Sequence, residues 1–350
     1  LRPTLLDGVR VLDLTNVLAG PFCCYQLAVV GADVIKVEMP GTGDLARELG
    51  ADPALNSSYM GISFLAQNAG KRSITLNLKS EAGKQIFKRL VETAQVVVEN
   101  FRPGVMRRLA LDYPTLREIN PGLIYCAISG FGQDGPLKDN PAYDQIVQGL
   151  SGVMSLTGSK DEPPLRVGYP IADTIGGMTA AFAITAALVR RDRTGEGEFI
   201  DVSMLESTLA AMGWQVSNYL IGGIAPKRAG NDNMTASPSG TFATGDGLLN
   251  IAANRQVQFE TLCKIVGRTE LINDPRFSAR QARLANRAAL TEEIEAALMK
   301  RSAADWAHEL NAAGVPSGEI LSVPEILGHS QVIERGFVKT FENVPGVSRD

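Results

Sequence analysis

One acidic residue separates an apolar segment from the start of a predicted helix. Asp173 lies in "RVGYPIADTIGGMTAAFAITAAL", residues 166–188. Aspartate is among the best N-cap residues, and the pattern predicts helix from Thr174 onward. A carboxylate at a helix N-terminus is also held as an anion by the dipole and the free N–H groups. Its oxygen could attack a carbonyl if neighbouring glycines let a substrate approach the backbone, so cap and nucleophile are compatible roles.

A second group of candidate residues follows an apolar run in "VVVENFRPGVMRRLALDY", residues 96–113. A predicted strand ends at Asn100 and Phe101, and a Pro-Gly turn leads to a helix with Arg107 and Arg108. Ligands of open α/β sheets bind at the carboxyl ends of strands. An amide, an aromatic ring and arginines there suit a nucleotide with phosphates. A solvated basic turn is the alternative.

The residues of several familiar mechanisms are missing. His308 and His329 are the only histidines, too few for a histidine-based metal cluster, and His308 lies on an ordinary amphipathic helix. The sequence has no GxSxG nucleophile elbow, no GxxxxGK[ST] phosphate loop and no GxGxxG after the first predicted strand. We therefore expect no metal and no NAD.

Composition indicates a globular protein, with 45% hydrophobic and 21% charged residues in a chain of 350. The net charge of −4 comes from interspersed acids and bases without a basic stripe, so we expect no nucleic-acid partner. The apolar run at residues 178–189 is shorter than the roughly 20 residues of a membrane span and predicts a buried helix. The four cysteines lie in apolar contexts and predict small buried side chains in a reducing compartment such as the cytoplasm.

Short β-branched runs alternate with helical patterns in the first half of the chain. Strands are predicted at residues 10–14, 32–38, 73–78, 96–100, 123–129 and 199–202. Helices are predicted at residues 80–94, 174–191 and 205–220. Strands that alternate with helices favour a parallel, doubly wound α/β sheet.

The amino-acid composition changes at residues 222–240, a segment rich in Gly, Ser, Asn and Pro that predicts a loop. A strand pair is predicted around residues 240–253, and helices at residues 255–266, 287–300 and 302–313. We expect a large domain over residues 1–205, a linker helix over 206–225, a smaller α+β domain over 226–325 and the start of a return to the large domain over 326–350.

Seven motifs, in order, resemble one known family. They are "VLDLTNVLAGPF", "GADVIKVEMPGTGDLAR", "NAGKRSITLNLK", "VENFRPGVMRRL", "INPGLIYCAISGFGQDGP", "AYDQIVQGLSGVM" and "ADTIGGMTA". The chain is similar over its whole length to the class III CoA-transferases, the CaiB/BaiF family. "SNYLIGG", "KRAGNDN" and "QFETLCKIVGRTELINDPRF" resemble the branch of succinate hydroxymethylglutarate CoA-transferase and related dicarboxylate CoA-transferases.

The resemblance implies a role for each matching residue. Asp173 matches the nucleophile, which forms aspartyl anhydride and aspartyl-CoA thioester intermediates, and the loop from Gly230 to Gly240 resembles a loop that covers them. A Rossmann-like large domain and an interlocked homodimer are also implied, as is a sequence that runs on past Asp350. The residues that match the coenzyme A site are Leu18, Ala19, Leu76, Asn77, Leu78, Lys79, Asn100, Phe101, Arg108 and Tyr143.

The expected reaction moves CoA between a short dicarboxylyl-CoA and a free carboxylic acid. Arg47 and Arg166 are candidates to bind a distal carboxylate, although either could be a structural ion pair. The formyl-CoA branch has Gln where this chain has Leu18, which argues against oxalate and formyl-CoA as substrates.

Two alternative functions and the choice of compartment stay open. One is a 2-methylacyl-CoA racemase of the same fold, which needs a His-Asp pair where this chain has Tyr143. The other is a CoA-binding protein without catalysis. The compartment is the cytoplasm or another reducing one, such as the mitochondrial matrix.

Overall fold

The computed structural model describes residues 4–340, which fall into two compact units. The large unit holds the described residues up to Thr157 together with Pro164–Lys227, and the small unit holds Gly158–Pro163 and the described residues from Arg228 onward. Residues 206–225, expected as a linker, group with the large unit. Residues 326–340, expected to begin a return to the large domain, group with the small unit, and the rest of that segment lies outside the described residues.

A parallel sheet forms the centre of the large unit, as the alternating pattern predicts. Among the described residues its strand order is β3-β2-β1-β4-β5-β6, and every neighbouring pair is parallel. The chain order reverses between β1 and β4, so the turns after these strands flank the crevice where open α/β sheets bind ligands. The strands are β1 (Arg10–Asp13), β2 (Asp33–Glu38), β3 (Arg72–Thr75), β4 (Val96–Glu99), β5 (Ile124–Ser129) and β6 (Glu198–Ser203).

β3 is shorter than the strand predicted at residues 73–78. It ends at Thr75 because the chain turns at Asn77. The Asn77 side-chain oxygen accepts the Lys79 N–H at 3.0 Å, and the Asn77 carbonyl accepts the Ser80 N–H at 3.0 Å. Such local bonds compete with a strand ladder. The turn leads into α4 (Glu81–Val91).

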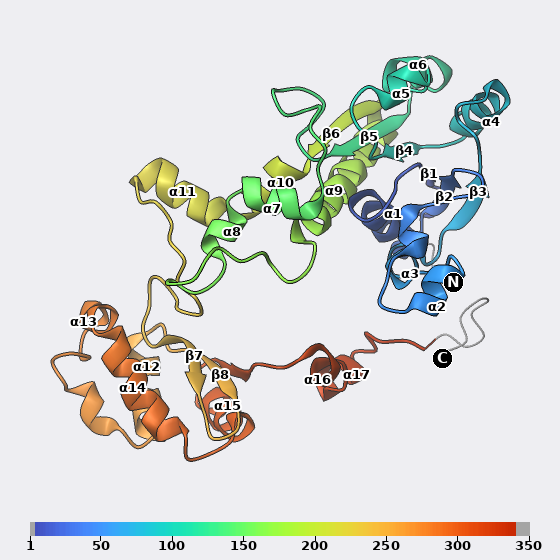
Figure 1. The fold of residues 1–350 in the computed structure, drawn as a ribbon. Helices are drawn as coiled ribbons and strands as arrows, with labels where there is room; N and C mark the ends of the chain where they lie inside the picture. The colour runs from blue at the N-terminus through green and yellow to red at the C-terminus, as the bar shows by residue number, and fades with distance from the viewer. Residues whose placement is uncertain (1–3, 341–350) are drawn as a thin grey trace. The chain divides into compact units, whose positions relative to one another are not determined.

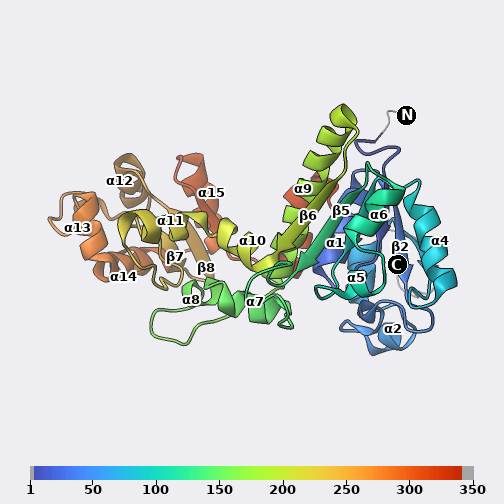
Figure 2. The same ribbon diagram turned by 90° about the horizontal axis from the view of Figure 1, so that it is seen from above.

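Helices cover both faces of the sheet (Figures 1 and 2). α1 (Ala19–Val29) and α9 (Ile171–Thr194) contribute to the core on one face, and α4 and α6 (Tyr113–Ile119) to the core on the other. Successive side chains of a strand point to opposite faces. Val96 and Val98 accordingly pack on the α1 and α9 side, and Val97 packs on the α4 side. Both faces are therefore apolar, and polar groups gather at the strand ends.

The other helices of the large unit are short. The helix predicted over residues 205–220 is divided at Met212, next to Gly213, a residue type with low helix propensity. These helices are η1 (Leu45–Glu48), α2 (Pro53–Ser57), α3 (Ile62–Asn68), α5 (Val105–Arg108), α7 (Asp144–Leu150), α8 (Val153–Leu156), α10 (Met204–Ala211) and α11 (Gly213–Gly222).

α9 contains the apolar run that the sequence marks as a buried helix. By length and composition alone it could cross a membrane, and within residues 4–340 it is the one helix that meets those criteria. Its Ala180 and Ile184 are buried in the core of the sheet. A Cβ at Gly177 would lie 2.6 Å from the Ala19 carbonyl oxygen, and one at Gly176 would lie 2.9 Å from Met204 Cγ. The two glycines therefore permit close packing of α9 against Ala19 and Met204.

The small unit has its own antiparallel sheet, in the order β7-β8-β9 within the part of the chain described. β9 (Ser317–Glu319) was not predicted from the sequence. Phe242, Phe259, Leu262 and Trp306 belong to its separate apolar core. The other elements are β7 (Ser239–Ala243), β8 (Leu248–Ala252), α12 (Gln256–Ile265), η2 (Thr269–Ile272), α13 (Arg280–Ala285), α14 (Arg287–Leu298), α15 (Ala303–Ala312), α16 (Val323–Leu327) and α17 (Ser330–Glu334).

The cysteines and histidines lie as expected. Cys23, Cys24, Cys126 and Cys263 are free and buried, which confirms them as small core side chains. His308 is exposed on α15. Within residues 4–340 no group of three or more His, Cys, Asp or Glu side chains is arranged to hold a metal ion.

Candidate active site

A cavity of about 180 Å³ lies where the turns after β1, β4 and β5 meet in the large unit. These turns are far apart in sequence, and the parallel sheet brings them to one edge. The cavity contains six of the predicted site residues, and the other predicted positions lie elsewhere. Those six are Leu18, Ala19, Asn100, Phe101, Tyr143 and Asp173.

Asp173 lies in the first turn of α9, and its predicted N-cap role is wrong. The helix begins at Ile171, with Pro170 before it, so Asp173 is already inside the helix. The Thr174 N–H bonds to the Pro170 carbonyl at 3.0 Å, which fixes this earlier start. The carboxylate of Asp173 is thus free of a capping duty and lines the cavity.

The acid that does serve the start of α9 comes from another helix. Asp144, the first residue of α7, accepts the N–H of Ala172 at 2.8 Å and of Asp173 at 3.3 Å through Oδ1. Gln148, one turn further along α7, donates to Asp144 Oδ2 at 2.6 Å and accepts the Val167 N–H at 2.9 Å. Asp144 was not predicted as a site residue from the sequence, where its one signal is the i, i+4 spacing of Asp and Gln in "YDQIVQ".

The sequence predicts that the helix N-terminus holds the Asp173 carboxylate as an anion, but in the structure the pKa of this carboxyl is raised. Burial, together with the nearby charge of Asp144, raises the pKa of Asp173 to about 7. Burial disfavours the charged form of the carboxyl, and repulsion by the Asp144 charge adds to this effect. Near neutral pH the carboxyl is therefore divided between its protonated and ionised forms.

The turn between β1 and α1 also lines this cavity. Asn100 clamps it, because its side-chain Oδ1 accepts the Asn16 N–H at 2.8 Å and its Nδ2 donates to the Asn16 carbonyl at 2.8 Å. This pairing fixes the backbone immediately before Leu18 and Ala19. Asn100 therefore shapes the cavity as well as lining it.

Two further cavities adjoin the first along the edge of the sheet. One, of about 170 Å³, shares Asn100, Phe101 and Tyr143 with it. The next, of about 560 Å³, shares Lys138 with the second and contains Arg108. The three hollows therefore share lining residues along the ends of β4 and β5, with Asp173 in the first and basic side chains in the third.

The predicted residues after β3 lie away from these cavities. Leu76, Asn77, Leu78 and Lys79 follow the edge strand of the sheet, and none of them lines the three hollows. Lys79 is exposed. Their place in a coenzyme A site stays a prediction.

The structure gives different surroundings to the two candidate arginines. Arg47 binds both carboxylate oxygens of Glu38, through Nε and Nη2 at 2.7 Å each, and its guanidinium lies 3.7 Å from the centre of the Phe64 ring. These contacts make it the structural ion pair that the sequence left open. Arg166 is exposed in the loop before α9 and forms no ion pair within residues 4–340.

Gly230 and Gly240 belong to the small unit. Both line an open hollow of about 600 Å³, together with polar residues that include Asp232 and Asn250. Gly230 has φ +58°, a left-handed conformation that favours glycine. Their role over reaction intermediates stays a prediction.

The whole chain matches known proteins. Residues 6–347 match CoA-transferase family III. The chain is 44% identical to an acetyl-CoA:oxalate CoA-transferase of Acetobacter aceti, over 95% of this chain and 85% of that protein. It is 40% identical to a succinate–glutarate CoA-transferase of Agrobacterium fabrum, over 99% of this chain and 88% of that protein. A CaiB/BaiF family protein from Brucella suis has a similar structure, with a TM-score of 0.85, 39% identity and coverage of 96% and 89%.

These matches confirm the resemblance. The chain belongs to CoA-transferase family III, the CaiB/BaiF family, and it is a CoA-transferase. Several relatives are named for dicarboxylic acids. One of them is named for oxalate, so oxalate stays among the acceptors to test despite the argument from Leu18.

Proposed function

We propose that the enzyme moves CoA from a short dicarboxylyl-CoA, such as succinyl-CoA, to a second carboxylic acid, with Asp173 as the nucleophile. The observation that carries this proposal is the position of Asp173. Its carboxylate has no capping duty and lines the same cavity as the β1–α1 turn, at the sheet edge where α/β proteins bind ligands.

In the proposed reaction the Asp173 carboxylate attacks the thioester carbonyl, and the C–S bond breaks to give a mixed anhydride and CoA thiolate. The thiolate then attacks the Asp173 carbonyl carbon, which releases the first carboxylate and leaves an aspartyl-CoA thioester. The acceptor carboxylate attacks that thioester, which forms a second anhydride and frees the thiolate again. Attack of the thiolate on the acceptor carbonyl yields the new acyl-CoA and restores Asp173.

Each attack creates a tetrahedral oxyanion that needs hydrogen-bond donors. Ala19 lines the cavity and is the first residue of α1, whose first N–H groups have no acceptor within the helix. We assign this helix start to oxyanion stabilisation. No imidazole is needed, which suits a chain with two histidines.

The adjoining hollows support a path for coenzyme A. The thioester lies beside Asp173, the pantetheine arm passes Asn100 and Phe101, and the phosphates reach Arg108 and Lys138. Arginine and lysine are suited to phosphate binding. Arg166, which is exposed and forms no ion pair with any residue that the structure describes, is the remaining candidate for the distal carboxylate of the substrate.

Self-association of the chain into a homodimer is part of the proposal. α11 exposes Trp214, Tyr219, Leu220 and Ile221, with exposed fractions of 58% or more. An exposed apolar surface of this kind is typical of protein interfaces. The free buried cysteines suit the cytoplasm or another reducing compartment.

A matrix of reactions tests the function. The enzyme is incubated with each of several acyl-CoA donors and each of several free acids, oxalate and glutarate included, and the products are identified by mass spectrometry. We expect transfer from succinyl-CoA to at least one dicarboxylate. Hydrolysis alone, or transfer only to monocarboxylates, would contradict the proposed substrate class.

A further inference from the structure

The β1–α1 turn contains a residue in an unfavourable backbone conformation. Val17 has φ +68°, in the left-handed region that β-branched residues seldom adopt. Leu18 and Ala19 follow directly and line the cavity that contains Asp173. If Val17 relaxed to a negative φ, this lining would change its shape. Something must hold this residue in place.

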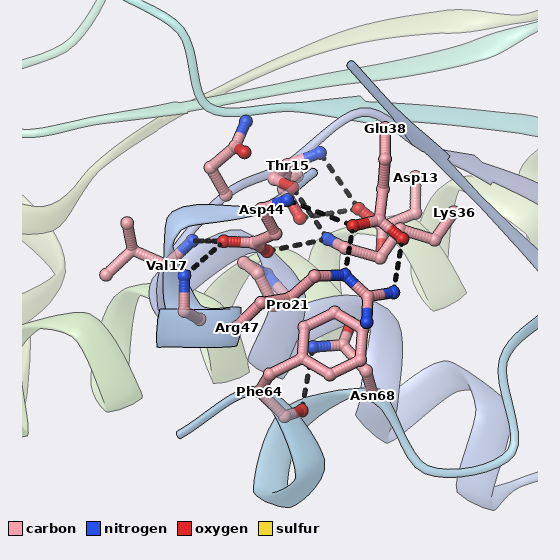
Figure 3. A network of polar contacts seen from close by, with 12 residues as sticks. Asp13, Thr15, Val17, Pro21, Lys36, Glu38, Asp44, Arg47, Phe64 and Asn68 are labelled. Atoms are coloured by element: carbon pink, nitrogen blue, oxygen red, sulfur yellow. Dashed lines mark hydrogen bonds and ion pairs between the residues drawn. The ribbon is translucent and has the colours of Figure 1, made fainter. Parts of the chain in front are cut away.

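The acceptor that holds Val17 is Asp44, in the loop after β2. Asp44 Oδ1 accepts the Val17 N–H at 2.9 Å (Figure 3). The same oxygen accepts the N–H of Ala46 at 2.9 Å and so caps η1. Together with the Asn100 clamp on Asn16, this bond fixes two consecutive residues of the turn.

The Asp44 carboxylate is itself held rigidly. Its side chain is fully buried, and Oδ2 lies 2.9 Å from Nζ of Lys36, which is also buried. Lys36 Nζ donates as well to the Thr15 carbonyl at 2.8 Å, two residues before Val17. The Asp44 N–H donates to Glu38 Oε2 at 2.9 Å. The Lys36 ammonium group therefore binds both the Asp44 carboxylate and the Thr15 carbonyl of the turn.

The surrounding charges balance. Three acids, Asp13, Glu38 and Asp44, are paired with three bases, Lys71, Arg47 and Lys36, in contacts of 2.7 to 2.9 Å. Buried ions that are fully paired form a rigid arrangement, and loss of one partner leaves another ion uncompensated. This network of three ion pairs is therefore suited to fixing the position of the Asp44 acceptor oxygen.

We propose that Asp44 is a positioning residue for the acyl-CoA site. It holds Val17 in the left-handed conformation, so that Leu18 and Ala19 face the reacting thioester. The inference rests on the proposed function for its kinetic consequence, but the hold on the Val17 amide can be measured without activity.

Two substitutions distinguish the effect of where the Asp44 acceptor oxygen lies from the effect of its charge. Asp44→Asn keeps an acceptor at the same place and loses the charge, whereas Asp44→Glu keeps the charge for Lys36 and displaces the acceptor. We expect Asp44→Glu to raise KM for acyl-CoA by roughly tenfold or more, in line with the loss of a hydrogen bond to a charged group, and Asp44→Asn to raise it less. Asp52→Glu is the matched control, because Asp52 also caps a short helix, α2, but accepts the N–H groups of Ala54 and Leu55 and not that of Val17.

Hydrogen exchange gives the independent readout. The Val17 amide should be protected in the wild type and in Asp44→Asn, and should exchange faster in Asp44→Glu. In a Val17→Gly background the kinetic penalty of Asp44→Glu should shrink, because glycine adopts positive φ without restraint. A wild-type KM and unchanged Val17 protection in Asp44→Glu would overturn the proposal. A larger KM defect in Asp44→Asn than in Asp44→Glu would also overturn it, and neither result depends on which residue is the nucleophile.

Discussion

Asp144 Oδ1 accepts the backbone N–H of Asp173 at 3.3 Å, so Asp144 occupies the N-terminus of α9 and Asp173 lies beside it. The stronger bond to Ala172, at 2.8 Å, completes this cap from a neighbouring helix. Asp144 therefore does the capping and leaves Asp173 available for chemistry. Its charge also raises the pKa of Asp173, in addition to the effect of burial.

Replacement of the nucleophile should abolish turnover without loss of the fold. We expect Asp173→Asn to lower kcat by several orders of magnitude, because an amide cannot form the anhydride. Stability should change by about 1 kcal/mol or less, since no described hydrogen bond uses the Asp173 side chain as a cap. Steady-state kinetics and thermal unfolding measure the two effects. Near wild-type turnover, or a hydroxylamine-trapped adduct on another acid such as Asp144, would contradict the assignment.

The activity should depend on pH through Asp173. Its pKa of about 7 means that the attacking anion is lost as the pH falls below 7, so kcat/KM for acyl-CoA should fall with it. Asp144→Asn removes the repelling charge and should move the inflection to lower pH, although burial keeps it above the ordinary value for aspartate. Asp192→Asn, at the exposed far end of α9, is the control. An inflection that stays in place or moves upward in Asp144→Asn would show that Asp144 does not tune Asp173.

The enzyme should not exchange the α-proton of 2-methylacyl-CoA. By the resemblance, a racemase needs a His-Asp pair where this chain has Tyr143, and no histidine is among the described residues that line the cavity of Asp173. Incubation of 2-methylacyl-CoA in heavy water, followed by mass spectrometry, should show no deuterium uptake. Rapid uptake would move the protein to the racemase branch.

The Glu38–Arg47 pair should contribute to stability above acidic pH. Burial opposes ionisation of Glu38, but bonds from Arg47 and Ser73 outweigh it and lower the pKa to about 2. Because the folded pKa is below the ordinary 4.5, this contribution is present above pH 4.5 and is lost as the pH falls toward 2. Glu38→Gln should lower the free energy of unfolding at pH 7 by on the order of 3 kcal/mol and flatten its acid dependence. Urea unfolding of this variant, compared with Glu48→Gln in the exposed part of η1, measures it; equal stabilities would refute the assignment.

The proposed homodimer should persist at micromolar concentration. If the two chains interlock, the subunits cannot separate without unfolding, so dilution should produce no folded monomer. Sedimentation velocity combined with circular dichroism distinguishes a folded dimer, a folded monomer and an unfolded chain. A folded monomer would contradict the interlocked arrangement.

The sequence by itself determined the parallel sheet, because β-branched runs alternating with helical patterns have few other ways to bury their apolar faces. It also pointed to Asp173 and to the Asn100–Phe101 strand end, which line one cavity in the structure, since these predictions depend on local residue types and on motifs that match a family. The predicted start of α9 was late by three residues, because the cap comes from Asp144, 28 residues before Ala172, and leaves no signal in the sequence around α9 itself.

Only the tertiary structure decided which charged groups pair. Asp144 with Ala172, Arg47 with Glu38 and Asp44 with Val17 are separated in sequence by 28, 9 and 27 residues. Each pair forms because the sheet brings particular turns to one edge, and burial there makes an unpaired charge or amide costly. Residue types can suggest that an arginine binds the substrate or that an aspartate caps a helix. The partner that each one meets depends on which strand ends become neighbours, and that is set by the packing of the whole unit.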